Sequence, residues 1–166
     1  MAKVTKLSGG NCIVGAGRED LTPPGKHAMA GYSRAGQIGR RAPPNTPESD
    51  ALWARALYLE DCETGEAALL CFVDLLSASL RLHQEVRARL PAELRDCLIL
   101  SGTHTHTAPG RFFGNRFYDL LAQKSLCGFN PRWTKFAAER IANACRTAYE
   151  QRRPGRVGVH ETLLWG

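Results

Sequence analysis

The amino-acid sequence predicts an α/β fold with a mixed, partly parallel sheet and flanking helices. Three observations predict it. Two apolar segments of strand length stand on either side of a segment with helical periodicity, and a strand, a helix and a strand in succession form a crossover with parallel strands. Another pair of strand-like segments is separated by a short turn sequence, which is typical of an antiparallel hairpin. A long segment near the carboxyl end predicts a helix with one apolar face.

The amino-terminal part predicts one strand and a long loop. The strand is expected at Cys12–Gly17, and the turn sequence Leu21–Gly25 follows it. Residues 26–50 are rich in glycine, proline, asparagine, serine and arginine, and such a stretch inside a compact domain is usually functional or disordered. Three residues of this loop are candidates to line a cleft, although plain surface is the commoner role of such residues: Gly31, Tyr32 and Gln37.

The next two strands are expected at Ala54–Leu59 and Ala67–Val73. The intervening sequence Asp61–Gly65 has the composition of a turn, so the two strands form a hairpin. Because the second strand is an almost continuous apolar run, we expect it to be buried on both faces of the sheet.

The remaining elements follow from periodicity and from breaking residues. Apolar residues from Leu76 to Leu90 repeat with helical spacing, and Pro91 marks the end of that helix. A strand is expected next, at Cys97–Leu100. Residues 111–129 carry aromatic side chains without a clean period, which indicates a loop with a short helix. The segments that complete the expected fold are a helix over Trp133–Tyr149, ended by Pro154-Gly155, and a strand that starts at Val157–Val159.

The composition excludes several classes of protein. No apolar run approaches the roughly 20 residues needed to cross a bilayer, and the first ten residues lack the apolar core of a secretory signal, so a cytoplasmic location is the default. Six cysteines contain no Cys-x-x-Cys pair and are expected to be reduced thiols. The net charge of +6 comes from scattered basic residues, so no nucleic-acid partner is expected. Transient contact with an anionic membrane surface stays compatible with that charge.

A pair of histidines, His104 and His106, stands in the sequence Ser101–Gly110. In extended backbone their imidazoles would point to the same side. Zinc in hydrolases is held by neutral imidazoles and a carboxylate or similar ligand, with one position open for water. Asp74 and His104 each follow one of the two parallel strands, so we expect them at the same edge of the sheet, where open sheets bind ligands. The residues alone leave open that each merely ends its strand.

Six short motifs follow one another along the chain: Gly15-Ala16-Gly17, Asp20 to Pro24, Met29 to Tyr32, Trp53 to Ala56, Phe72 to Asp74, and Gly102 to Gly110. In this order they resemble the amino-terminal region of the neutral (non-lysosomal) ceramidases and their bacterial homologues. The departures are small: Trp53 stands where that family has tyrosine, and Thr107-Ala108 replaces its Ser-Gly. The resemblance runs from about residue 13 to the end of the chain.

The resemblance implies that residues 1–166 form a single domain that is the incomplete amino-terminal portion of a larger catalytic domain. It implies a zinc-dependent amidohydrolase that cleaves the N-acyl bond of a sphingolipid-like lipid amide, giving a fatty acid and an amine. His104 is then the Zn²⁺ ligand and His106 the catalytic partner that handles protons, while Asp74 orients an imidazole or only ends a strand. The family's other ligands (a histidine, a glutamate and a tyrosine) and its nucleophilic serine match no position here. Family members are often secreted or membrane-associated.

Two alternatives stay open. The chain could be a truncated or degenerate homologue that acts as a non-catalytic binding or assembly module, or a zinc hydrolase of another amide or ester. A zinc ion with one ligand is held weakly, so we expect these 166 residues alone to have little metal affinity and no turnover. The sequence does not predict the oligomeric state.

Overall fold

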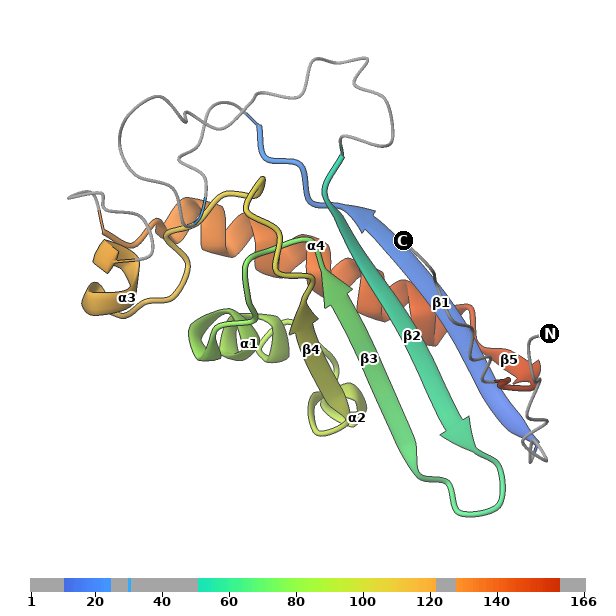
Figure 1. Ribbon diagram of the computed structural model, residues 1–166. Helices are drawn as coiled ribbons and strands as arrows, with labels where there is room; N and C mark the ends of the chain where they lie inside the picture. Colours follow the sequence, from blue (N-terminus) through green and yellow to red (C-terminus); the bar gives the residue numbers. More distant parts are fainter. Residues whose placement is uncertain (1–10, 25–29, 31–50, 122–127, 159–166) are drawn as a thin grey trace, which may run out of the picture.

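The computed structural model describes residues 11–24, 30, 51–121 and 128–158, and these residues form an α/β fold around one sheet (Figure 1). The strands are β1 (Cys12–Asp20), β2 (Trp53–Asp61), β3 (Ala67–Val73), β4 (Leu98–Gly102) and β5 (Arg153–Gly155). They lie in the order β4-β3-β2-β1-β5. Strands β3 and β4 are parallel and the other pairs are antiparallel. The predicted mixed, partly parallel sheet and its β2–β3 hairpin are confirmed.

In the described part of the chain, four helices accompany the sheet: α1 (Leu80–Arg87), α2 (Ala92–Arg95), α3 (Arg116–Leu121) and α4 (Pro131–Glu150). Helix α1 begins four residues later than the periodicity predicts, because the Ser79 hydroxyl accepts a hydrogen bond from the amide of Leu82 at 3.1 Å and so caps the helix at that point. The sequence did not predict α2, a single turn after Pro91. The short helix expected within residues 111–129 is α3. Among the described residues, no helix has the length and apolar character needed to cross a membrane.

Helix α4 packs across β1, β2 and β3 on one face of the sheet (Figure 1). Two glycines of β1, Gly15 and Gly17, permit this close approach. A Cβ atom at Gly15 would overlap the carbonyl oxygen of Ala148, and one at Gly17 would overlap that of Ala144. Glycine at alternate positions of β1 therefore brings the backbone of the strand directly against the helix.

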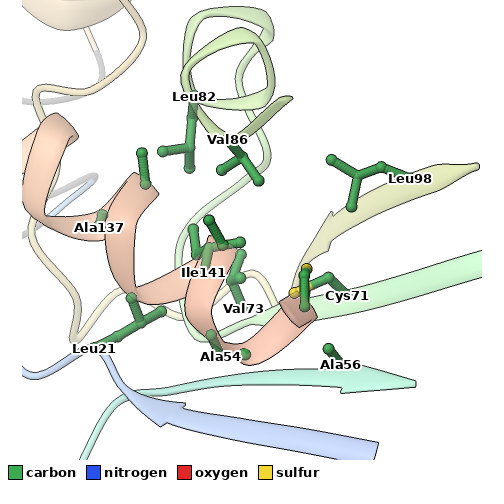
Figure 2. Close-up of a cluster of buried hydrophobic side chains, with 14 of the residues drawn as sticks. Leu21, Ala54, Ala56, Cys71, Val73, Leu82, Val86, Leu98, Ala137 and Ile141 are labelled. Atoms are coloured by element: carbon green, nitrogen blue, oxygen red, sulfur yellow. The ribbon is translucent and has the colours of Figure 1, made fainter. Parts of the chain in front are cut away.

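The core lies between this face of the sheet and the two longer helices. Figure 2 shows small and branched side chains of the sheet facing the apolar faces of α1 and α4. The labelled residues are Ala54, Ala56, Cys71 and Val73 of the sheet, Leu82 and Val86 of α1, Ala137 and Ile141 of α4, and Leu21 and Leu98. Cys71 and Cys145 are both fully buried, and the cysteines in the described part of the chain are free thiols, as expected.

The expectation that β3 is buried on both faces is wrong. Leu69, Cys71 and Val73 are fully buried against the helices, but Phe72, which points to the opposite face, is 47% exposed. An apolar run indicates burial without saying how many faces are covered. In the described part of the chain, only one face of the sheet is covered by helices (Figure 1).

The position expected for the last strand is also wrong. The strand is Arg153–Gly155, antiparallel to β1 with Cys12 opposite Gly155, and residues 156–158 lie outside it. Proline is acceptable here because β5 is an edge strand, where a missing amide hydrogen need not break a ladder. Pro154-Gly155 therefore belongs to the sheet, and α4 ends at Glu150.

Candidate functional site

The candidate site is formed where β3 and β4 end. The amide of Thr103 donates to the carbonyl of Val73 at 2.9 Å, and the amide of His104 donates to that of Leu75 at 3.0 Å. The segments that follow the two parallel strands therefore lie side by side. Asp74 and His104 lie at the same edge of the sheet, as the topology predicted.

Gly102, the last residue of β4, allows these two segments to meet. A Cβ atom there would lie 2.7 Å from the Cα of Ser77 and 3.0 Å from the carbonyl oxygen of Leu75. Real Cβ atoms do not approach backbone this closely, so the segment 75–77 can pass β4 only beside a glycine. Sequence reasoning gave this residue no role, although a glycine directly before the histidine motif was a signal of close backbone packing there.

Asp74 joins the ends of three strands. Its carboxylate accepts hydrogen bonds from the Trp53 amide (2.9 Å), from Nη1 of Arg55 (3.0 Å to each oxygen) and from the Thr103 hydroxyl (3.2 Å). Among the described residues these are its hydrogen-bond partners. Asp74 therefore fixes Thr103, the residue before His104, and no imidazole of the described residues bonds to its carboxylate.

The backbone at His104 is not extended. Its φ angle is +62°, in the left-handed region that residues other than glycine adopt rarely and histidine somewhat more often. Such a conformation costs on the order of 1 kcal/mol and persists where the surroundings fix it. The hydrogen bond from the His104 amide to Leu75 is one such constraint. The extended backbone in which the two imidazoles would point to the same side is therefore not the conformation at His104.

The two imidazoles nevertheless lie together. The ring centroids of His104 and His106 are 5.5 Å apart, and the rings meet edge to face at 85°. His104 is exposed and His106 is half-buried. The left-handed turn thus brings to one place the same two side chains that an extended strand would have aligned.

His106 is oriented by a backbone carbonyl from a distant part of the chain. Its Nδ1 lies 3.0 Å from the carbonyl oxygen of Ala30, which can only accept a hydrogen bond. Nδ1 therefore carries the hydrogen, and Nε2 of the neutral ring carries none. Ala30 is fully buried, and its amide donates to the carbonyl of Ala108 at 2.9 Å. This pairing joins residue 30 to the loop that carries the histidines.

The loop after the histidines is anchored to the core. The buried Ser79 hydroxyl donates to the carbonyl of Phe112 at 2.9 Å, and the Phe112 side chain is fully buried. Phe113 stacks on Phe112 with ring centroids 4.8 Å apart, whereas Phe117 and Tyr118 are exposed. Sequence reasoning missed the contact of Ser79 with this loop, although a serine before a helical segment signals a cap.

The described residues do not include a complete set of metal ligands. Catalytic zinc is usually held by three protein ligands. No group of three or more histidine, cysteine, aspartate or glutamate side chains that could hold a metal ion occurs in the described part of the chain. The candidate cleft residues Gly31, Tyr32 and Gln37 lie outside the described residues.

Comparisons with known proteins agree with the resemblance noted from the motifs. Residues 12–166 match the family described as neutral/alkaline non-lysosomal ceramidase, N-terminal. Neutral ceramidase of Drosophila melanogaster is 32% identical over 157 residues, which cover 91% of this chain and 21% of the relative. Neutral ceramidase of Pseudomonas aeruginosa is 29% identical over 110 residues, covering 63% of this chain and 16% of the relative.

The fold has a counterpart among solved structures. The crystal structure of neutral ceramidase from Pseudomonas aeruginosa matches with a TM-score of 0.72 at 26% identity. The match covers 87% of this chain and 22% of that one. The chain therefore spans about a fifth of the length of the relatives that it matches.

Proposed function

Because the chain belongs to the neutral/alkaline non-lysosomal ceramidase family, we propose that it forms the amino-terminal part of a zinc-dependent amidohydrolase. The reaction is hydrolysis of the N-acyl bond of a sphingolipid-like lipid amide to a fatty acid and an amine. The observation that carries the proposal is the approach of His104 and His106 at the carboxyl edge of two parallel strands, with ring centroids 5.5 Å apart.

In this proposal His104 is a zinc ligand. It is the exposed member of the pair, and neutral imidazole is a common donor to zinc. A zinc ion supplies Lewis-acid polarisation of the amide carbonyl and a bound water whose pKa falls to about 7. The left-handed backbone at His104 and the hydrogen bond from its amide to Leu75 fix the position of the His104 side chain at the edge of the sheet.

His106 is the proton-handling residue of the proposal. Since Nδ1 donates to the carbonyl of Ala30, Nε2 is the nitrogen able to accept a proton and then deliver it to the leaving amine. Acid and base catalysis by such a group contributes typically 10²–10⁴-fold to a rate.

Asp74 is a positioning residue in this proposal. It acts on His104 through Thr103, and it holds Thr103 from a carboxylate that Arg55 and the Trp53 amide fix in place. Gly31, Tyr32 and Gln37 remain candidates to contact the lipid amide.

A second candidate function is a non-catalytic binding or assembly module. The incomplete set of ligands in the described part of the chain favours it over an isolated enzyme. A hydrolase of a different amide or ester would have the same two histidines, so the choice among substrates depends on assays with short and long N-acyl chains.

The coding sequence beyond Gly166 distinguishes enzyme from module. An open frame that contains another histidine, a glutamate and a tyrosine supports the hydrolase, and a stop codon supports the module. In the hydrolase, the complete protein contains zinc and releases fatty acid from an N-acyl sphingoid base. We expect His104→Ala to lose zinc and His106→Ala to keep zinc but lose about 10²–10⁴-fold in kcat. Full activity of His104→Ala would overturn the proposal.

A further inference from the structure

The hydroxyl of Ser79 lies between α1 and the loop that carries the two histidines. We name residues 103–113 the histidine loop. The Ser79 hydroxyl accepts a hydrogen bond from the Leu82 amide at 3.1 Å and donates one to the carbonyl of Phe112 at 2.9 Å. Ser79 is only 6% exposed, so water competes little for either bond. One hydroxyl therefore caps the helix and also holds the far end of the histidine loop.

Helix capping explains only one of these two bonds. An N-cap side chain has to accept a hydrogen bond from the first turn of the helix, and aspartate or asparagine meets that need as well as serine does. The bond to Phe112 requires a donor, which a hydroxyl supplies and an ionised carboxylate lacks. The donor function of Ser79 thus serves the histidine loop and not the helix.

The histidine loop is fixed at both of its ends. At its start, the amide of His104 bonds to the segment that follows β3. At its end, the carbonyl of Arg111 accepts a hydrogen bond from the Asn130 amide at 2.7 Å, and the carbonyl of Phe112 accepts the bond from Ser79. The bond from Ser79 is made by a side chain, so a substitution can remove it.

His106 lies between these two fixed ends. Its Nδ1 meets the carbonyl oxygen of Ala30 at 3.0 Å, and the Ala30 amide donates to the carbonyl of Ala108 at 2.9 Å. Ala108 is fully buried and stands four residues before Phe112. If the end of the loop moves, Ala108 moves away from Ala30 and the imidazole loses its acceptor.

We propose that Ser79 is a positioning residue for His106. By donating to Phe112, it holds the histidine loop where Ala108 meets Ala30, and this pairing gives the imidazole an acceptor at Nδ1. The inference rests on the proposed function, in which His106 handles protons, because a ring with its hydrogen on Nδ1 has an Nε2 that can accept one. It does not require zinc, since every bond that carries it lies within this chain.

Three variants separate the two roles of the hydroxyl. Ser79→Gly removes the donor and keeps the start of α1, because glycine is a tolerated N-cap residue. Ser79→Thr keeps a hydroxyl that can both accept and donate. Gln84→Gly is the matched control, because glycine weakens α1 at an exposed position away from the histidine loop.

The tautomer of His106 is the first measurement. It is read from the NMR signals of the ring nitrogens in the ¹⁵N-labelled 166-residue chain, at pH 8 and with a zinc chelator present. In Ser79→Gly we expect the ratio of the Nδ1–H form to the Nε2–H form to fall about tenfold, the effect of losing one buried hydrogen bond. In Ser79→Thr and Gln84→Gly the ratio should stay within about twofold of the wild type. Loss of a helix cap alone would not change this signal.

Hydrogen exchange of backbone amides is the second measurement. The Ala30 amide should lose protection about tenfold in Ser79→Gly, because its bond to the loop weakens. The Leu69 amide, which donates to the carbonyl of Cys97 at 2.8 Å, should keep its protection and so shows that the sheet is folded. If Ser79→Gly does not fold, Ser79→Asp takes its place, because its ionised carboxylate caps the helix but cannot donate to Phe112.

Three results would overturn the inference about Ser79: an unchanged His106 tautomer in Ser79→Gly, an equal change in Gln84→Gly, or a change in Ser79→Thr as large as in Ser79→Gly. Each of them leaves the hydrolase proposal standing, because that proposal is judged by the zinc content of His104→Ala and the kcat of His106→Ala. Full activity of His106→Ala would remove the proposed proton transfer, whereas the measured effect of Ser79 on the imidazole would stand.

Discussion

At the residue scale, Asp74 determines how the histidine loop leaves the sheet. Its carboxylate is mostly buried, with 17% of the side chain exposed, and it accepts bonds from β2 and from Thr103. Hydrogen bonds to a charged group contribute about 1.5–3 kcal/mol when they are well shielded. The half-exposed Arg55 contributes less than this, because solvent screens it.

Asp74→Asn should lower the free energy of unfolding by about 1–2 kcal/mol, since an amide offers one acceptor oxygen in place of two charged ones. Asp96→Asn is the matched control, because Asp96 pairs with Arg87 at a position that is 90% exposed. Its effect should stay within about 0.5 kcal/mol. Urea unfolding at pH 7 measures both, and equal effects would show that Asp74 is an ordinary surface ion pair.

The residue scale also shows what a sequence can and cannot predict about the site. The meeting of Asp74 and His104 was predictable, because it follows from two parallel strands and one crossover. The left-handed backbone of His104 was not, because it depends on a hydrogen bond to Leu75 from the neighbouring strand end. The contact of His106 with Ala30 joins residues 76 positions apart, and no local pattern signals it.

At the scale of elements, the packing of α4 on β1 depends on two glycines. Most expected strands and helices were confirmed because hydrophobic periodicity and breaking residues are local signals. The wrong position expected for the last strand also comes from a local signal. Pro154-Gly155 is a strong turn signal, and only pairing with β1 makes it a strand.

Gly17→Ala should destabilise the protein by about 1–3 kcal/mol, because the new methyl group would meet the backbone carbonyl of Ala144 and force the helix away from the strand. Gly158→Ala is the control, since a Cβ atom there meets nothing within 4 Å. Thermal unfolding followed by circular dichroism measures both variants. A Gly17→Ala protein as stable as the control would contradict the close packing of α4 and β1.

At the scale of the whole molecule, helices cover only one face of the sheet in the described part of the chain. The apolar run of β3 predicts that the strand is buried. It does not predict that helices cover only one face, because the same residues suit a strand covered on one face or on two. The relatives extend far beyond the matched region, which covers 21% of the Drosophila melanogaster protein.

The most direct test of the central claim, that His104 is a zinc ligand, is a zinc titration of the ¹⁵N-labelled 166-residue chain followed by the NMR signals of the histidine rings. We expect weak binding that shifts the ring nitrogens of His104, leaves His83 unchanged and is lost in His104→Ala. His106 should show Nδ1–H throughout, because the Ala30 carbonyl fixes that form. An unchanged His104 ring while zinc binds elsewhere, or tight stoichiometric zinc that survives His104→Ala, would contradict the account.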